Sequence, residues 1–281
     1  MRFVSPELSG TLREENLFED AAKLQGEVFR EVKTRRTLRF EVGSKRYFVK
    51  LHYGVGWGEI VKNLVQLRAP VLGAENELRA IHKLQELGVD TMTPMAYVSE
   101  GTNPAKIRSC IVTQALENTK SLEDLVLDGN VKWSLRRKII FKIADIARIM
   151  HDHGINHRDF YICHFLFAMD YFGDERAEEP QVFLIDLHRA QIRKRTPQRW
   201  REKDIGGLLF SGIDAGLTRT DLLRFMQTYS GISVRETLSK HNEFWVQVLK
   251  RARKLYVQDH GVASVDLDVI WANMQRIKNS I

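Results

Sequence analysis

The chain of 281 residues has little cysteine and no long apolar run. Its only cysteines are Cys110 and Cys163, which argues against a disulfide scaffold and for a reducing compartment. No stretch approaches the ~20 apolar residues that a membrane-spanning helix needs. The segment from Met1 to Gly10 lacks the apolar core of a signal peptide. These absences predict a cytoplasmic protein whose contact with membranes is at most peripheral.

Two common phosphate-binding patterns are also absent. Neither G-x-G-x-x-G nor G-x-x-x-x-G-K-[ST] occurs anywhere in the chain. Lys33, Arg35 and Arg36 occupy the turn between the first two expected strands, where they could supply positive charge to phosphates or form a solvated turn. The glycine-rich run Gly54–Gly58 comes later and fits a hinge or a role on the acceptor side.

The charge balance is basic, with 43 Lys and Arg against 36 Asp and Glu, a formal net charge of +7. This excess suits an anionic partner such as nucleic acid, acidic lipid, a phosphorylated glycan or an acidic carrier protein. A simply solvated basic surface explains it equally well. No nucleic-acid-binding motif accompanies the charge, so we expect no nucleic-acid partner.

The most informative stretch is His157-Arg158-Asp159, followed later by Asp186 after the apolar run 182–185. In protein kinases, H-R-D precedes an Asn that binds a second metal, and a later strand ends in an Asp that holds the other metal. The pattern therefore predicts Asp159 as the catalytic base and Asp186 as a ligand of Mg²⁺. It indicates phosphoryl transfer from a nucleotide.

His164 stands where protein kinases have the metal-binding Asn. A neutral imidazole binds magnesium less well than an oxygen ligand, so His164 could instead hydrogen-bond Asp159 or a phosphate. Both roles, as a metal and nucleotide ligand or as a hydrogen-bond partner, stay open. Several histidines crowd this region beside Cys163, but the adjacent Glu of a zincin site is missing, which argues against zinc.

Lys50 ends an alternating strand that begins at Tyr47, and it resembles the kinase lysine that contacts nucleotide phosphates. Such a lysine needs an orienting Glu on the next helix. Glu77 fits best because it shares the apolar helix face with Ala80 and Leu84, and Glu75 is the alternative. We expect the Asp159 and Asp186 carboxylates to converge on one triphosphate, with Lys50 opposite them.

Strand patterns dominate the first part of the chain and helix patterns dominate from Ser121 onward. We expect strands at 27–32, 37–42, 46–51, 96–100 and 109–115. We expect helices at 14–25, 59–67, 75–87, 135–151, 204–212, 221–229, 233–241, 244–258 and 266–277. This order predicts an α+β, two-lobed, protein-kinase-like fold, with a small β-rich nucleotide-binding lobe at residues 1–116 and a helical catalytic lobe at 117–281.

No A-P-E motif follows Asp186, which weakens a protein-kinase interpretation. A phosphotransferase of the aminoglycoside type, a kinase acting on another small molecule or on protein tyrosine, and an inactive binding module are the alternatives. Seven segments carry a resemblance to a known family: Arg35–Arg39, Tyr47–Lys50, Gly54–Ile60, Pro70–Ala74, Gly154–Leu166, Ile185–Ala190 and Pro197–Asp204. In these segments the chain resembles the WaaP (RfaP) family, the lipopolysaccharide core heptose(I) kinases of Gram-negative bacteria.

The resemblance implies ATP-dependent phosphorylation of the 4-hydroxyl of the first heptose of the inner core. It further implies Mg²⁺, a lipid-linked lipopolysaccharide acceptor, work at the cytoplasmic face of the inner membrane, and an associated acyl carrier protein. His164 in place of Asn is a departure from protein kinases that looks normal for this family.

Overall fold

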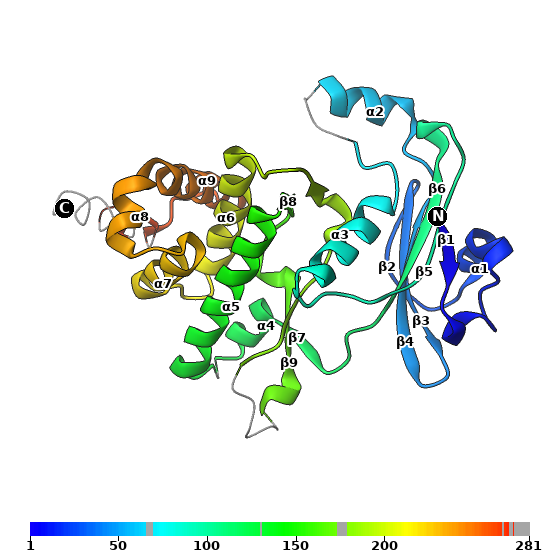
Figure 1. The fold of residues 1–281 in the computed structure, drawn as a ribbon, viewed down its shortest axis with the longest axis horizontal. Coiled ribbons are helices and arrows are strands. Elements are labelled where there is room, and N and C mark those ends of the chain that lie inside the picture. The colour runs from blue at the N-terminus through cyan, green and yellow to red at the C-terminus, as the bar shows by residue number, and fades with distance from the viewer. Residues whose placement is uncertain (66–69, 130, 173–178, 266, 270–271, 273–281) are drawn as a thin grey trace. The chain divides into compact units, whose positions relative to one another are not determined.

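The computed structural model describes residues 1–65, 70–129, 131–172, 179–265, 267–269 and 272. The chain forms two compact units (Figure 1). The first comprises Met1–Glu86, Thr91–Glu117 and Leu187–Arg189, and the second comprises Leu87–Asp90, Asn118–Asp186 and Ala190–Ile281. A sheet dominates the first unit and helices dominate the second, which confirms the predicted α+β class. The assignment of residues 1–116 to nucleotide binding and of 117–281 to catalysis stays a prediction.

An antiparallel sheet of six strands forms the first unit, in the order β1-β5-β6-β4-β3-β2. The strands are β1 Arg2–Val4, β2 Glu27–Val32, β3 Arg35–Val42, β4 Lys45–His52, β5 Pro94–Glu100 and β6 Arg108–Gln114. Four 3-10 helices belong to this unit, η1 Pro6–Leu8, η2 Glu14–Asn16, η3 Pro104–Lys106 and η6 Leu187–Arg189. A hairpin joins β3 and β4 across Gly43 and Ser44, with Val42 opposite Lys45.

Two helices of this unit, α1 (Leu17–Lys23) and α3 (Glu75–Glu86), lie on opposite faces of the sheet (Figure 1). Tyr47, Val49 and Leu51 alternate along β4 and belong to the buried core that α1 covers. Because successive side chains of a strand point to opposite faces, Lys50 is turned toward the other face.

The helix after β4 begins earlier than its sequence pattern predicts. The pattern predicts a helix at 59–67, but α2 spans Gly56–Val65, so Gly56 and Gly58 of the glycine-rich run belong to its first turn. Positions 66–67 lie outside the described residues. The first amide groups of any helix have no partner within the helix, which makes a flexible residue less costly there than in the middle.

Six helices make up most of the described part of the second unit: α4 Leu122–Leu127, α5 Trp133–Asp152, α6 Gln198–Ile213, α7 Arg219–Ser230, α8 Val234–Lys240 and α9 Asn242–His260. The strands are β7 Thr119–Ser121, β8 Ile155–Asn156, β9 Phe165–Ala168, β10 Val182–Leu184 and β11 Gln191–Ile192, and the 3-10 helices are η4 Ile162–His164 and η5 Met169–Phe172. The order β10-β9-β7 forms a small sheet, and β11 pairs with β8. The apolar stripe of α5 is buried, as at Ile143 and Ala147.

Helix α6 starts six residues before its predicted start at Asp204, because the extended backbone of Pro197 precedes Gln198 and sets the beginning of the helix. The helix expected at 266–277 lies largely outside the described residues. In the part of the chain that the structure describes, no helix is both long and apolar enough to cross a membrane.

Candidate active site

The H-R-D loop of the second unit is held by a buried carboxylate from α6. The backbone amides of His157 and Arg158 donate to Asp204 across 2.7 Å and 2.9 Å, and Asp204 is 1% exposed. Arg158 adopts a left-handed φ of 78°, a conformation that costs roughly 1–3 kcal/mol in a residue other than glycine. The two bonds to Asp204 offset this cost and fix the backbone just before Asp159.

Asp204 is itself oriented by the last turn of α5. His151 Nε2 lies 3.3 Å from its carboxylate, and His151 Nδ1 lies 2.8 Å from the Tyr229 hydroxyl. Burial raises the pKa of Tyr229, so its hydroxyl stays protonated and can donate to His151. Neither Asp204 nor His151 was among the residues that we predicted for the site. The local sequence carries no signal for this role, because Asp204 directly follows the charged residues 201–203 in α6.

A close contact of α6 with the loop explains a second feature of that helix. A Cβ atom added at Gly207 would lie 3.2 Å from the Phe160 carbonyl oxygen and 3.2 Å from the Tyr161 ring. Glycine therefore lets α6 approach the chain directly after Asp159.

The ring of His157 links the loop to the residue before Asp186. Its Nε2 lies 2.9 Å from the Ile185 carbonyl oxygen, and burial is the main cause that lowers the pKa of His157. The neutral ring donates its Nε2 hydrogen to that carbonyl. His157 thus ties the H-R-D backbone to the segment that carries Asp186.

His164 lies between the other two predicted site residues of the second unit. Its Nδ1 is 2.6 Å from the Asp159 carbonyl oxygen, and its Nε2 is 3.7 Å from Asp186 Oδ2. Burial alone would lower the pKa of His164, but hydrogen bonds to Cys163 and Asp159 and the charges of Cys163 and Asp186 outweigh it and raise this pKa to about 9. Asp186 has a left-handed φ of 60°, and Ile185 donates its amide to the His164 carbonyl. The structure therefore brings Asp159, His164 and Asp186 together.

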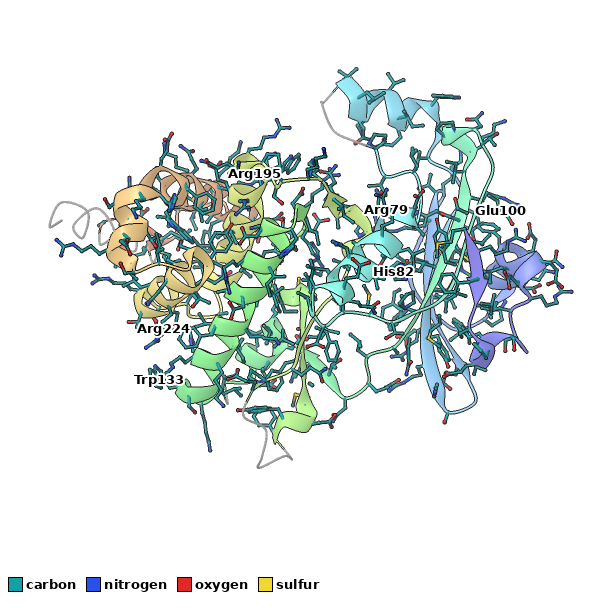
Figure 2. The ribbon with its side chains drawn as sticks, in the orientation of Figure 1. Arg79, His82, Glu100, Trp133, Arg195 and Arg224 are labelled. Atoms are coloured by element: carbon teal, nitrogen blue, oxygen red, sulfur yellow. The ribbon has the colours of Figure 1, made fainter. Side chains whose placement is uncertain are left out.

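In the first unit, Lys50 and Glu77 form an ion pair of 2.7 Å. The Glu77 side chain is fully buried and the Lys50 side chain is 17% exposed, whereas Glu75 is exposed. The pair joins β4 to the apolar face of α3. Figure 2 shows Arg79 and His82 on the same helix. Arg79 is exposed, whereas Glu77 is buried.

Arg35 and Arg36, which we placed in the turn before the strand, are the first two residues of β3, so that part of the prediction is wrong. They lie on different faces of the sheet. In the register with β4, Arg35 is opposite His52 and Arg36 is opposite Leu51. Arg35 therefore shares a face with Lys50, because paired residues point to the same side. Arg36 is turned to the α1 face, where it donates to the Ala22 carbonyl across 3.3 Å. The structure does not bring Arg36 together with Lys50.

An apolar cavity of about 100 Å³ lies among the helices of the second unit. Its walls include Val126, Ile139, Ile162, Leu209 and Phe225. Separately, the described residues contain no group of three or more His, Cys, Asp or Glu side chains arranged to hold a metal ion.

A sheet unit with a buried Lys–Glu pair and a helical unit with an H-R-D loop define a kinase-like phosphotransferase. The chain belongs to the lipopolysaccharide kinase (Kdo/WaaP) family, whose model matches residues 19–229. Membership in a kinase family makes ATP the phosphoryl donor.

Individual relatives show the same likeness over most of their length. The lipopolysaccharide core heptose(I) kinase WaaP of Escherichia coli K12 is 49% identical over 230 residues, which are 81% of this chain and 86% of the relative. The protein of the same name from Pseudomonas aeruginosa is 46% identical over 242 residues, or 85% and 90% of the two chains. A solved structure of WaaP in complex with acyl carrier protein is similar with a TM-score of 0.78 and 39% identity, covering 91% of this chain and 99% of that one.

Proposed function

We propose that this protein transfers the γ-phosphoryl group of ATP to the 4-hydroxyl of the first heptose in the lipopolysaccharide inner core. The observation that carries the proposal is the catalytic loop, in which Asp204 fixes the backbone of His157 and Arg158 directly before Asp159. The relatives at 46–49% identity are named heptose(I) kinases, and this name indicates the acceptor that we propose.

Asp159 orients the acceptor hydroxyl and accepts its proton. Phosphoryl transfer needs little covalent chemistry from a protein, so the correct aim of this hydroxyl and the neutralisation of phosphate charge make up most of the catalysis. A carboxylate on a constrained backbone suits this task, because the base must keep a fixed position to orient the acceptor hydroxyl.

Lys50 contacts the phosphates of the nucleotide, and Glu77 holds the Lys50 ammonium in place. Since Glu77 is fully buried at 2.7 Å from Lys50, the ammonium has few other low-energy positions. Arg35 adds positive charge on the same face of the sheet, while Arg36 contributes to the contact with α1 instead.

The donor set fits Mg²⁺, which is usually bound by one or two carboxylates and takes its remaining ligands from phosphates and water. Asp186 is the residue that would hold it, and the ion would neutralise phosphate charge. His164 Nε2 lies 3.7 Å from Asp186 Oδ2, so His164 either binds the ion beside Asp186 or holds that carboxylate in place.

The partner that best fits the chain is an acyl carrier protein, as in the complex of the similar WaaP structure. Acyl carrier proteins are acidic, and the net charge of +7 complements them. Helix α9 presents Lys250, Arg251, Arg253 and Lys254 along one segment, and the apolar cavity of the second unit would suit an acyl group. The lipid-linked acceptor places the enzyme at the cytoplasmic face of the inner membrane.

Mass spectrometry of core oligosaccharide tests the proposal. We expect one added phosphate on the innermost heptose after incubation with the full-length protein, ATP and Mg²⁺, and none when ATP is omitted. Phosphate on a soluble small molecule or on protein tyrosine, with the core unchanged, would contradict it.

A further inference from the structure

Four cationic side chains gather around the ring of Trp200 in the second unit. From the ring centroid, Arg158 Cζ lies at 5.7 Å, Arg193 Cζ at 5.7 Å, Arg199 Cζ at 5.4 Å and Lys203 Nζ at 4.3 Å. We call these five residues the Trp200 cluster. An aromatic ring attracts each cation, but it carries no net charge and leaves their mutual repulsion in place.

Arg193 is affected both by burial and by this repulsion. Burial, and after it the charge of Arg199, lowers the pKa of the Arg193 guanidinium. Its hydrogen bonds run to the side-chain oxygens of Asn156 and Gln191, which are neutral amides. Such bonds satisfy the donors of the guanidinium without cancelling its charge. A partly buried cation in this position is stabilised by a nearby anion.

Two buried N–H donors at the cluster have no hydrogen-bond partner among the described residues. They are Trp200 Nε1, on a residue only 9% exposed, and Nδ2 of the fully buried Asn156, whose oxygen receives Arg193. Buried donors are nearly always paired in folded proteins, so each of these calls for an explanation. Together with the four cations they make a donor-rich, positively charged region.

The position of the cluster connects it to the reaction. Arg158 is the neighbour of Asp159 in the chain, and its backbone is held by Asp204 at 2.9 Å. Arg193 donates its amide to the Gly154 carbonyl, and a Cβ at Gly154 would lie 1.8 Å from the Arg193 carbonyl oxygen. Glycine at 154 therefore lets the segment of Arg193 lie directly against the start of the catalytic loop.

The first turn of α6 adds to the positive field. Arg199 and Trp200 belong to that turn, which contains no acidic residue, and the N-cap Pro197 offers no side-chain cap. A helix N-terminus favours negative charge, so an arginine there is better placed beside a bound anion than alone.

We infer that the Trp200 cluster binds an anionic group, a phosphate or a carboxylate, carried by the sugar acceptor close to the hydroxyl that is phosphorylated. This inference rests on the proposed function, because the acceptor is the ligand. The cluster is a positioning site: it fixes the acceptor relative to Asp159.

Direct binding without ATP tests the site apart from the reaction. Fluorescently labelled core oligosaccharide with an unphosphorylated heptose is titrated with full-length protein, and the Kd is read from anisotropy. We expect Arg193→Gln, Arg199→Gln and Lys203→Gln each to raise this Kd roughly tenfold, the effect of losing one charge-assisted hydrogen bond. The Kd for ATP should not change.

Lys194→Gln and Arg195→Gln serve as matched controls. Both residues are exposed and belong to the same basic segment, and Arg195, labelled in Figure 2, lines a different hollow with Asp152 and Trp245. Each control removes the same charge as a cluster variant but outside the cluster, so we expect the acceptor Kd to change less than twofold. Equal effects in controls and cluster variants would show a general electrostatic attraction and would overturn the site.

Two modified acceptors identify the anion. One has its phosphates removed, and the other has its carboxyl groups reduced to alcohols. The modification that removes the bound group should raise the Kd of the wild-type protein about tenfold and change that of Arg199→Gln much less. The reason is that the effects of removing two groups that contact each other are not additive. The inference is wrong if neither modification weakens binding. It is also wrong if a modification raises the Kd of Arg199→Gln by the same factor as that of the wild-type protein.

Trp200→Phe keeps the aromatic ring and removes only the indole N–H. We expect it to weaken acceptor binding while circular dichroism and the thermal midpoint stay close to wild type. A purely structural role of the cluster predicts the reverse, a lower thermal midpoint with unchanged acceptor Kd. Transfer assays on the same samples separate the proposals: absent transfer with cluster-dependent binding contradicts the proposed function and supports the site.

Discussion

The Lys50–Glu77 pair and the H-R-D loop around Asp159 are built in different ways. Lys50 lies on a regular strand and Glu77 on a regular helix, and one ion pair of 2.7 Å joins them. The loop has a left-handed residue at Arg158, and its backbone depends on partners far along the chain. Regular elements aim a side chain by their own periodicity. An irregular backbone keeps its shape only when surrounding groups over-determine it.

Asp159→Asn is expected to give the largest effect. It removes the base while leaving the bonds to Asp204 intact, so the turnover number should fall roughly 10²- to 10⁴-fold. The Kd for ATP and the thermal midpoint should stay near wild type. A coupled assay of ADP release measures the loss, and unchanged transfer to heptose would remove Asp159 from the mechanism.

Asp204→Ala should show how far the loop depends on its distant support. The change leaves the buried amides of His157 and Arg158 without an acceptor, so we expect the free energy of unfolding to drop by about 3 kcal/mol. Turnover should drop with it. Urea denaturation measures the stability.

Asp152→Ala is the matched control for Asp204→Ala. Its carboxylate forms a surface ion pair with Arg201, and its side chain is 52% exposed, so the loss should stay below about 1 kcal/mol. Equal losses in the two variants would mean that Asp204 is not a special support.

The sheet unit has an acid-sensitive residue beside Lys50. Burial first, and then the charges of Arg35, Lys50 and His188, lowers the pKa of His52 to about 3. The unfolded chain binds this proton near pH 6.5, so stability is lost as pH falls from about 6.5 toward 3, by about 2 kcal/mol at pH 5. Urea denaturation at pH 7.5 and pH 5 measures the difference.

His52→Leu should remove this part of the pH dependence, whereas His153→Gln, at an exposed position, should retain it. An unchanged dependence in His52→Leu would assign the acid sensitivity to other groups, such as His157, whose pKa is also lowered by burial.

Glu77→Gln should give the smallest effect. Glutamine has nearly the same size but no charge, so Lys50 loses its orienting partner while the packing of α3 remains. We expect the KM for ATP to rise roughly tenfold with little change in thermal midpoint. Glu75→Gln on the exposed side of the same helix should have no effect. An equal rise of the KM for ATP in both variants would show that the Lys50–Glu77 ion pair does not contribute to ATP binding.

Local pattern was sufficient for the regular half of the site. Alternation in Tyr47–Lys50 predicted the strand, and the spacing of Glu77 with Ala80 predicted the buried helix face, so their contact could be anticipated. The roles of both residues and their convergence with the two aspartates stay predictions. For Arg35 and Arg36 the pattern was insufficient, since only the register with β4 shows which of two adjacent residues shares a face with Lys50.

The support of the loop could not be predicted from local pattern. Asp204 lies 47 residues from His157 in the chain, and Tyr229 lies 78 residues from His151. Nothing in the composition of α6 distinguishes a buried acid from the exposed charges near it. The start of that helix was also predicted too late, because the pattern of apolar residues begins after its first turn.

Residue order alone is enough to establish the kinase-like class and the strand-then-helix arrangement and to predict the reactive groups, because these depend on periodicity and on short motifs within one segment. The partners of those groups depend on folding. Contacts between distant segments decide which carboxylate holds the H-R-D loop, which arginine shares a face with Lys50 and which cations surround Trp200. Such contacts exist only once the chain has folded.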